Sequence, residues 1–470
     1  MKATIPQNPD LIKNLFALLE AHRAVLRRKS IYLRVFALVM AEIFTFARHT
    51  VTQLLMSLGL NEDDWSGWYR LFSQEQFDGA QVAEVLLAET LEHVGEDELY
   101  VVAGDATQTP RSSAKMEGVG WLRNMRTPAF KVGIHRAQRW FNGWWLMPPE
   151  NGYSRAMPLR WLPAFTEKSK PQAHEPCKEW EAAVIFLTWL LAQFARLGRF
   201  SQKLLMVADG RYDTLDLWQH LPSGVTLLAR SAKNRVLKHL PPADAHGNRK
   251  YGERARAPQA WLRERQGWKK TCLTIRGRER KLRYRVEGPY LRDKAPNVPR
   301  FLIVVSGQVY SKRGRRKHRK AAFYLVNAVQ NEVGDWVLPL PIETLLFWAW
   351  QRWEIEVCHR ELKSNFGLGH KQCWNPQAAV RSVQWSAWVY SVLLLAGYRT
   401  WGLCGAPDVP TRWWRGSGRW SLNTLWRAYR AALWGSHEFR PLDWATPDNM
   451  ARNGAFRQGL FNAVYGSARS

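Results

Sequence analysis

LYVVAGDATQTP, residues 99–110, is the stretch that indicates the fold of this chain. Its apolar half has the composition of a buried strand, and that strand leads directly into Asp105. A second stretch of this kind, KLLMVADGRYD, leads into Asp209, and the helical pattern CKEWEAAVIFLTWLLAQFARLG lies between the two. Strands that alternate with helices indicate an α/β sheet. Because ligands usually bind just beyond the carboxyl ends of strands in such sheets, Asp105 and Asp209 are candidate site residues.

A chain of 470 residues is too long for one hydrophobic core. The predicted secondary structure also changes along the chain. Helical patterns occupy the beginning, whereas short strands such as CLTIRG, LRYRVEG and RFLIVVSG alternate with basic loops further on. We therefore expect an α/β fold made of a helical N-terminal domain (1–95), a core in two pieces (96–232 and 340–403), a basic β-rich insertion between those pieces (233–339), and a C-terminal tail (404–470). The tail contains one predicted helix, SLNTLWRAYRAALW, which Ser421 would cap.

The charge of the chain is strongly unbalanced. Lys and Arg number 68 against 40 Asp and Glu, a formal net charge of +28 with a sequence pI near 10.2. Such an excess usually marks a polyanionic partner, and nucleic acid is a better expectation than a ribosomal or membrane surface. Most of it lies between Arg249 and Lys320, where 24 Lys or Arg face only 5 Asp or Glu.

That basic stretch ends in the run SKRGRRKHRK. We expect the run to contact the phosphate backbone, although a solvated loop could carry the same charges. The candidate DNA-binding residues in it are Lys312, Arg313, Arg315, Arg316 and Lys317.

Several other classes of protein are disfavoured by the sequence. The five cysteines are odd in number and form no CxxC pair, which argues against a disulfide framework and a zinc site and fits a reducing cytoplasm. Residues 1–10 do not resemble a signal peptide, and the longest apolar runs, Ala182–Ala195 and Trp388–Gly397, are short for a bilayer and are expected to be buried helices. Most of the 26 Trp should be core residues, while those in Thr411–Arg415 could stack on bases.

The segment RHTVTQLLMSLGLNEDDWSGWYRLF, Arg48–Phe72, predicts two short helices joined by a turn. Its apolar residues keep helical spacing up to Leu58, Gly59 ends the first helix, and the second helix follows Asn61–Asp64. A unit of this kind can enter a major groove of DNA, although most helical hairpins bind nothing.

A third acidic motif, RWEIEVCHRELKSNFGLG at Arg352–Gly369, is predicted to be a single helix. At about 100° per residue, one charged stripe contains Glu356 together with Arg352, Arg360 and Lys363. The stripe lies between apolar shoulders, so Glu356 should be partly desolvated, whereas Glu354 and Glu361 fall on the far side and should see solvent. A desolvated carboxylate needs positive partners or a metal ion, and the two neighbouring arginines are the simpler alternative.

Three carboxylates that converge on one point repel each other unless a divalent cation lies between them. Two hard cations about 3.5–4 Å apart, bridged by carboxylates, are the usual arrangement for in-line phosphodiester displacement. Asp105, Asp209 and Glu356 are therefore predicted to be catalytic residues and ligands of Mg²⁺ or Mn²⁺. Taken singly, each aspartate could equally be a turn or a helix cap, as could Asp213 and Asp216.

The three acidic motifs, GDATQTPRS, MVADGRYD and RWEIEVCHRELKSNFGLG, resemble those of DDE transposases of bacterial insertion sequences. The segments GVGW…FKVGIHRAQRW and GLGHKQCWNP are also similar to this family, so the likeness extends over most of residues 45–400. In the family an arginine, the catalytic glutamate four residues later and a lysine seven residues beyond share one helix face, which corresponds to Arg352, Glu356 and Lys363. One departure is that Ala349 stands where the family often has a tyrosine, so Trp348 or Trp350 would have to replace its phosphate contact.

The resemblance implies a ribonuclease H-like core with a β-strand insertion between the second aspartate and the glutamate. It also implies cleavage of the terminal inverted repeats of the element, attack of the freed 3′-hydroxyl on target double-stranded DNA, and a homodimer that joins two ends in a synaptic complex. Arg352 and Lys363, with Arg360 beside them, would hold DNA phosphates. In some relatives the DNA passes through a hairpin, where a Trp of the insertion could stack on a flipped base.

Two other functions remain open from the sequence. A former transposase acting as a DNA-binding regulator would not need all three acidic residues, and a nuclease of the same fold would cut DNA without strand transfer. A structural nucleoprotein would explain the charge but not the carboxylates.

Overall fold

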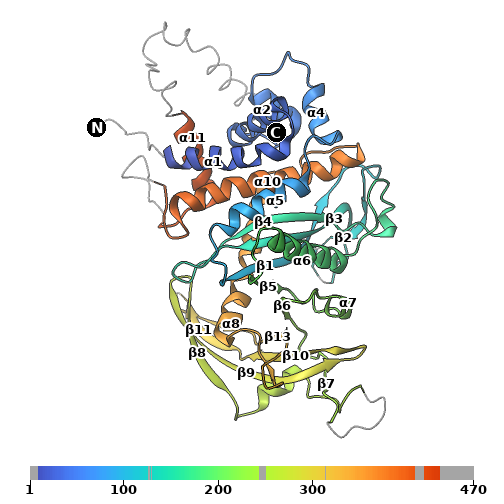
Figure 1. Cartoon of the computed structure of the whole chain (residues 1–470), viewed down its shortest axis with the longest axis vertical. Coiled ribbons are helices and arrows are strands. Elements are labelled where there is room, and N and C mark those ends of the chain that lie inside the picture. The colour runs from blue at the N-terminus through green and yellow to red at the C-terminus, as the bar shows by residue number, and fades with distance from the viewer. Residues whose placement is uncertain are drawn as a thin grey trace, which may run out of the picture.

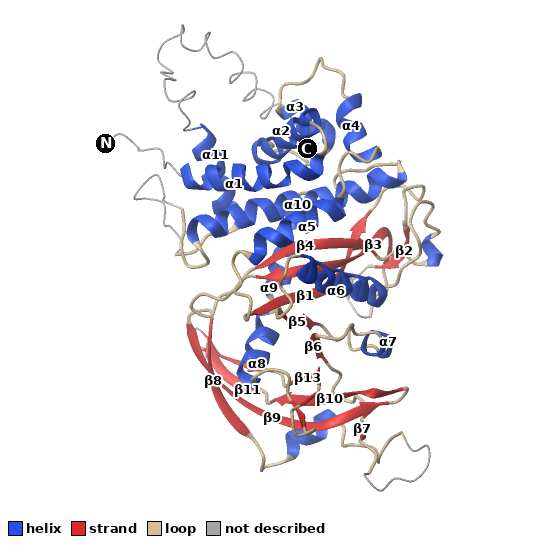
Figure 2. Cartoon of the chain, viewed as in Figure 1, coloured by secondary structure: helices blue, strands red, loops and turns tan. Residues whose placement is uncertain are grey.

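The computed structural model describes residues 9–124, 127–128, 130–242, 250–312, 314–407 and 418–434. Helices form one end of the molecule, a mixed sheet lies in the middle and a curved sheet forms the other end (Figures 1 and 2). The expected mixed α/β fold is therefore confirmed, with a helical N-terminal region, a β-rich insertion and a helix near the C-terminal end of the described residues.

The helical end is organised around α10 (Pro376–Trp401), a long helix that is almost entirely buried from Ala378 to Gly397. It begins with Asn375 as its N-cap, whose side chain accepts a hydrogen bond from the backbone of Ala378. The helices around it come from both ends of the chain (Figure 1): α1 (Pro9–Ala21), α2 (Lys29–Phe44), α3 (Val51–Ser57), α4 (Ser66–Ser73), α5 (Gly79–Leu91) and α11 (Leu422–Trp434).

The two predicted helices of the segment Arg48–Phe72 are confirmed as α3 and α4. The Thr50 side chain caps α3, and Gly59, with φ +77°, terminates it in the left-handed region that glycine adopts without strain. Asp64 accepts hydrogen bonds from the backbone and the hydroxyl of Ser66, where α4 begins. The predicted cap of α11 is confirmed too, since Ser421 Oγ accepts a hydrogen bond from the backbone of Thr424.

The middle layer is a mixed sheet in which β1 (Leu99–Pro110) occupies the centre. On one side β1 pairs antiparallel with β3, and β3 in turn pairs with β2 and β4; on the other side β1 is parallel to β5, and β5 to β6. Three antiparallel strands followed by two parallel ones, with α6 and α10 packed against them, form the ribonuclease H-like arrangement that was expected. The bounds are β2 (Gly120–Arg123), β3 (Ile134–Leu146), β4 (Ala156–Pro163), α6 (Glu179–Arg196), β5 (Lys203–Ala208), α7 (Leu215–Gln219) and β6 (Val225–Arg230).

The insertion continues the same sheet. Its last long strand, β13, pairs antiparallel with β6 of the core, and the order then runs through β10 and β9 to β7, while β8 also pairs with β9. The predicted strands are confirmed, with bounds β7 (Lys238–His239), β8 (Lys269–Ile275), β9 (Arg278–Arg292), β10 (Ala295–Val305) and β13 (Ala322–Asn327). Smaller pairs are β11 (Gln308–Lys312) with β12 (Arg315–Arg319), and β14 (Val329–Gln330) with β15 (Trp336–Val337).

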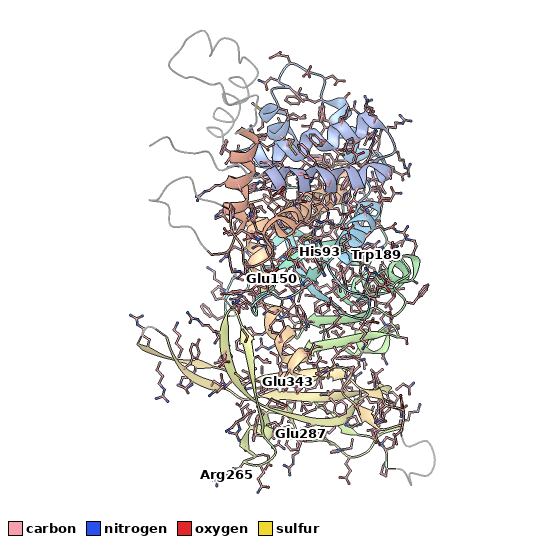
Figure 3. All side chains as sticks on the ribbon, turned by 60° about the vertical axis from the view of Figure 1, so that its left-hand side comes forward. His93, Glu150, Trp189, Arg265, Glu287 and Glu343 are labelled. Atoms are coloured by element: carbon pink, nitrogen blue, oxygen red, sulfur yellow. The ribbon has the colours of Figure 1, made fainter. Side chains whose placement is uncertain are left out.

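Figure 3 shows the side chains of both halves. Glu287 of β9 and Glu343 of α8 (Ile342–Gln351) lie in the half that contains the insertion, whereas His93 and Glu150 lie toward the helical half. Glu150 accepts hydrogen bonds from the backbone N–H groups of Leu403 and Cys404, so it fixes the chain that leaves α10.

The stretch Arg352–Gly369 is not a single helix, and the exposure predicted for its glutamates was wrong. Helix α8 ends at Gln351, a turn follows at Arg352 and Trp353, and α9 (Glu354–Ser364) starts after it. Glu356 has the more exposed carboxylate, with 43% of its side-chain surface accessible, whereas Glu361 is buried.

The reason is that Ile355, Cys358 and Leu362 form the buried face of α9, and Glu361 adjoins them. Glu361 tolerates burial because Arg155 donates to it at 2.7 Å and the Tyr390 hydroxyl at 2.6 Å. Trp353, in the turn before α9, is 52% exposed although it is apolar. Glu354 pairs with Arg276 of the insertion instead of facing solvent alone.

Within the described residues, no helix is both long enough and apolar enough to cross a membrane. The two longest apolar runs lie in α6 and α10, and all five cysteines are free thiols. Many of the tryptophans are core residues, as expected; Trp140, Trp144, Trp145, Trp218 and Trp385 are fully buried. The segment Thr411–Arg415 lies outside the described residues.

Candidate active site

Asp105 and Asp209 occupy adjacent positions where the parallel pairing of β1 with β5 ends; Asp209 follows the last residue of β5, whereas Asp105 lies within β1. In the register of β1 with β5, Gly104 is opposite Ala208, so the two aspartates occupy the next position on each strand. A Cβ at Gly104 would lie 2.1 Å from the terminal methyl group of Met206, so any larger residue would force the Met206 side chain to move. The glycine that precedes Asp105 thus lets β1 and β5 pack with both carboxylates at the same edge.

The environment of the two carboxylates is unequal. Burial raises the pKa of Asp209, and the neighbouring Asp105 raises it further, against the lowering effects of the Arg211 N–H and the Arg352 charge. Burial also acts to raise the pKa of Asp105, but contact with His359, the Ala106 N–H and the Arg352 charge together lower it. Two partly buried carboxylates therefore lie near each other, and the charge of Arg352 acts on both.

His359 is a site residue that the sequence reasoning missed. Its Nε2 lies 3.4 Å from Oδ2 of Asp105, and its ring packs edge-on against Trp144 with the centroids 4.8 Å apart. Burial lowers the pKa of His359, so the imidazole is mainly neutral near pH 7. Its position three residues after Glu356 places it on the same side of α9, and this spacing was the only sequence signal that could have identified it.

Glu356 lies in the same region but is turned toward Arg352. The two side chains are 3.4 Å apart across the turn between α8 and α9, and the charge of Glu356 also acts on His359. Among the residues that the structure describes, no group of three or more His, Cys, Asp or Glu side chains is close enough to hold a metal ion. The structure thus brings Asp105 and Asp209 together and leaves Glu356 outside ligand distance of them.

The pair of aspartates nevertheless has the donor chemistry of a divalent-cation site. One oxygen of each carboxylate accepts a backbone hydrogen bond, from Ala106 to Asp105 and from Arg211 to Asp209. A hard cation between the two carboxylates would relieve the repulsion by which Asp105 raises the pKa of Asp209. Asp105 and Asp209 therefore fit Mg²⁺ or Mn²⁺ as ligands.

The loop that follows Asp209 is fixed by Asp213, which the sequence had suggested was a turn or cap residue. The Asp213 side chain is fully buried and lies 2.6 Å from Arg235 and 3.1 Å from Arg292. It also accepts hydrogen bonds from Ser231 and from the indole of Trp218. Because Arg292 belongs to β9, this cluster fastens the loop after Asp209 to the insertion.

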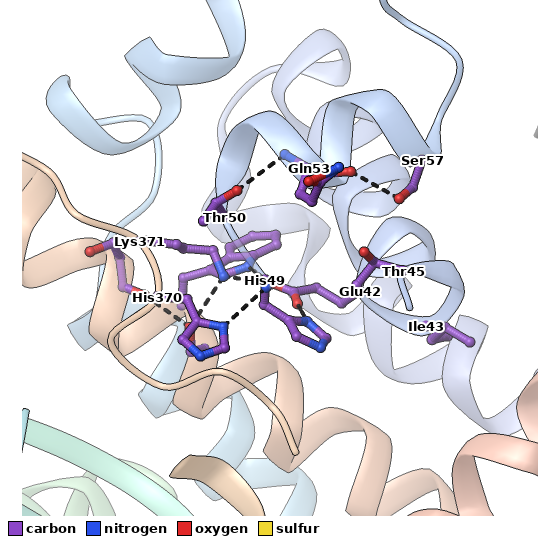
Figure 4. Close-up of polar contacts among 12 residues, drawn as sticks. Glu42, Ile43, Thr45, His49, Thr50, Gln53, Ser57, His370 and Lys371 are labelled. Carbon is purple, nitrogen blue, oxygen red and sulfur yellow. Dashed lines mark hydrogen bonds and ion pairs between the residues drawn. The ribbon is translucent and has the colours of Figure 1, made fainter. Parts of the chain in front are cut away.

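The loop that follows α9 is fixed by a second buried cluster (Figure 4). Lys371 lies 2.8 Å from one oxygen of Glu42, and His49 lies 2.5 Å from the other. The backbone N–H of His49 donates to Nδ1 of His370. Burial acts to raise the pKa of Glu42, but the charges of Lys371 and His49 outweigh it and lower the pKa to about 2. This cluster joins α2 and the residues just before α3 to the loop that follows α9.

The predicted DNA-binding residues lie in two places. Arg360 is exposed on α9, while Lys363, at the end of that helix, lines a hollow beside Asp105. In the hairpin formed by β11 and β12 the side chains of Arg315, Arg316 and Lys317 are exposed. Arg313 and the side chain of Lys312 lie outside the described residues.

Trp348 and Trp350, the two candidates to replace the family's tyrosine, differ in their exposure. Trp348 is 6% exposed and belongs to the core, which removes it as a phosphate contact. Trp350 is partly exposed and packs against the guanidinium groups of Arg319, at 3.9 Å from the ring centroid, and Arg280, at 5.4 Å.

Comparison with known proteins is consistent with this geometry. A search of curated proteins gives no match to the chain. A family model described as DDE superfamily endonuclease matches residues 26–288, which is more than half of the chain. The matched region includes Asp105 and Asp209 and ends before α9. On this match, and with its ribonuclease H-like sheet, the chain belongs to the DDE superfamily of endonucleases.

Proposed function

We propose that this chain is a transposase that cleaves the terminal inverted repeats of an insertion sequence and joins the freed 3′-hydroxyl to target DNA. The family supports nuclease or transposase activity on DNA. The observation that carries the proposal is that Asp105 and Asp209 lie at adjacent positions of β1 and β5 and that Asp105 raises the pKa of Asp209, with Arg352 and His359 beside them.

In this proposal Asp105, Asp209 and Glu356 are the catalytic carboxylates. When bound, Mg²⁺ or Mn²⁺ would activate the attacking oxygen and stabilise the leaving oxygen. Glu356 is exposed and pairs with Arg352. When a DNA phosphate binds Arg352 in its place, the Glu356 side chain can rotate toward the aspartates. His359 holds Asp105 in place from the opposite side.

The remaining basic residues would bind and orient the DNA. Arg352 and Lys363 lie closest to the carboxylates and would hold phosphates next to the reacting one, with Arg360 beside them. The exposed β11–β12 hairpin, including Arg315, Arg316 and Lys317, would contact the backbone further away, and α3 with α4 in the N-terminal domain (1–95) would contact the end sequence. A homodimer is proposed because two ends must be joined.

The test is incubation of the purified chain with Mg²⁺ and a duplex that carries one end of the element, with products resolved on a denaturing gel. Nicking at the end followed by joining to a second duplex is the expected result, and Glu356→Gln should abolish both while DNA binding is retained. Nicking without joining would reduce the function to a nuclease. Binding without nicking by the wild type would overturn the proposal in favour of a regulator.

A further inference from the structure

A hollow of about 130 Å³ lies directly beyond Asp105. One water molecule needs about 10–15 Å³ of a cavity volume of this kind. The hollow therefore has room for a group larger than several water molecules. It is open to solvent, and its lining comes from six separate segments of the chain: Ala106, Thr107, Gln108 and Pro110 of β1, Asn124 after β2, His135 and Arg139 of β3, Glu179 at the start of α6, Arg211 after β5, and Lys363 of α9.

The hollow exists because β5 is shorter than β1. Strand β5 ends at Ala208, opposite Gly104, whereas β1 continues to Pro110 with β3 as its neighbour on the other side. The loop after Asp209 turns away at this point and brings Arg211 to one wall. Gln108 is three residues beyond Asp105, about 10 Å along an extended strand. A DNA strand that passes the carboxylates would cover that distance in about three nucleotides.

The lining has an excess of positive charge. Arg139, Arg211 and Lys363 contribute three permanent cations and Glu179 a single carboxylate. Glu179 lies 3.2 Å from Nε of Arg139 and 4.0 Å from a terminal nitrogen of Arg211, so one acidic side chain holds two guanidinium groups toward the same space. Arg139 is partly buried, with 29% of its side-chain surface accessible, which limits the competition from water there, whereas Arg211 is exposed at 43%.

Neutral hydrogen-bonding groups complete the lining. His135 Nε2 and Gln108 Oε1 lie 2.8 Å apart, so each orients the other across adjacent strands. A group that has several acceptor oxygens and a single negative charge matches this combination of two oriented guanidinium groups, one ammonium group and polar side chains. A DNA phosphodiester is such a group, and it is the anion on which an enzyme of this family acts.

We propose that this hollow is the subsite for a backbone phosphate of the DNA strand a few nucleotides from the bond that is cut. Arg139 and Arg211 are its specific contacts, and Glu179 is the residue that positions them. The inference rests on the proposed function, since it takes DNA to be the substrate, and it adds three residues to the contacts that α9 would make.

The experiment measures binding and needs no cleavage. The probe is the element-end duplex in which backbone phosphates near the cleavage position are replaced, one at a time, by neutral methylphosphonates. Dissociation constants are measured by fluorescence anisotropy for wild type, Arg139→Gln and Arg211→Gln, all with the additional change Asp105→Asn to prevent cutting. Arg196→Gln is the matched control, because Arg196 is an exposed arginine of α6 that pairs with Glu84 outside the hollow.

In the wild-type background, one neutral phosphate should weaken binding by about tenfold or more, the effect of a lost charge-assisted hydrogen bond. Arg139→Gln should weaken binding of the unmodified duplex and show a clearly smaller further loss at that one phosphate, where Arg211 remains as a contact, while losses at other phosphates persist unchanged. Arg139→Lys, which keeps the charge, should recover part of the affinity, and Glu179→Gln should give an intermediate loss.

If Arg139→Gln and Arg211→Gln keep the full set of phosphate effects, or match Arg196→Gln, the subsite is refuted. Thermal unfolding of each variant shows whether an affinity loss comes from misfolding, in which case Arg139→Lys alone decides the result. Failure of the proposed function can be told apart from failure of the subsite. If the phosphate effect is present but the wild-type chain never cuts DNA, only the transposition chemistry is refuted.

Discussion

The buried carboxylate of Glu42 and the partly buried pair Asp105 and Asp209 have opposite surroundings. Glu42 is fully buried, and Lys371, His49 and the indole of Trp385 surround it, so its negative charge is matched in the folded protein. Asp105 and Asp209 lie beside each other, and the pKa of Asp209 is raised by burial and by its neighbour. The comparison separates a carboxylate whose charge is matched within the fold from a pair in which one carboxylate raises the pKa of the other.

The largest effect is expected from Asp105→Asn or Asp209→Asn. Each change removes a carboxylate from the pair that fits a divalent cation, so cleavage should fall by about a thousandfold or more, as when a group at a reacting centre is lost. Thermal stability without metal should stay the same or rise for Asp209→Asn, because the repulsion between the two carboxylates disappears. Cleavage gels and unfolding curves measure the two effects, and near-normal cleavage by both variants would contradict the assignment.

Lys371→Met should give the largest loss of stability. It leaves the charge of Glu42 buried without its main partner, which costs about 3–5 kcal/mol in comparable cases. The double variant Glu42→Leu with Lys371→Met removes both charges and should recover most of that loss. Urea unfolding measures the free energies, and a double variant no more stable than Lys371→Met would show that the cluster acts through shape rather than charge.

The pH dependence of stability should separate the same groups. The pKa of Glu42 is lowered from its ordinary value of 4.5 to about 2 in the folded chain, so its stabilising contribution is complete above pH 4.5 and is lost as the pH falls toward 2. This contribution is roughly 3 kcal/mol. Glu42→Gln should flatten the stability profile between these pH values relative to wild type, and an unchanged slope would place the acid sensitivity elsewhere.

Divalent cations should stabilise the wild type through the aspartate pair. A ligand that binds only the folded state at about 100 times its Kd adds about 2.7 kcal/mol. Addition of Mg²⁺ or Mn²⁺ should therefore raise the unfolding temperature of the wild type and have little effect on Asp209→Asn. Glu42→Gln serves as the control that keeps the response. An equal response in all three proteins would indicate nonspecific binding.

The smallest effect is expected away from both groups, in the β11–β12 hairpin. Replacing Arg315, Arg316 and Lys317 by Ser should leave stability unchanged and weaken DNA binding. The slope of log K against log salt should fall by about 0.9 for each phosphate contact that is lost. Anisotropy titrations at several salt concentrations give the slope, and an unaltered slope would make the hairpin a solvated charged loop.

The sequence predicted the aspartate pair because both aspartates directly follow apolar strands, and strand ends of a parallel pair meet at one edge. It predicted the helical and β-rich regions from local patterns. It failed at Glu361, because a helical wheel shows which residues share a face but not which face is buried. Only the distant residues Arg155 and Tyr390 make the burial of Glu361 possible.

The partners of Asp213 and Glu42 could not be predicted for the same reason. Asp213 meets Arg292, and Glu42 meets Lys371, across long separations in sequence that periodicity does not encode. The hollow beside Asp105 depends on six segments and on the unequal lengths of two strands, so it becomes visible only in three dimensions.

The antiparallel pairing of β13 with β6 makes the insertion inseparable from the catalytic core. A shortened protein that ends the sheet at β6 would present a row of unpaired backbone groups, which invites edge-to-edge aggregation. Relatives or engineered variants that lack this module would need another strand, a covering helix or charged side chains to protect that border. Deleting the insertion to shorten the enzyme would therefore reduce its solubility before it affected its chemistry.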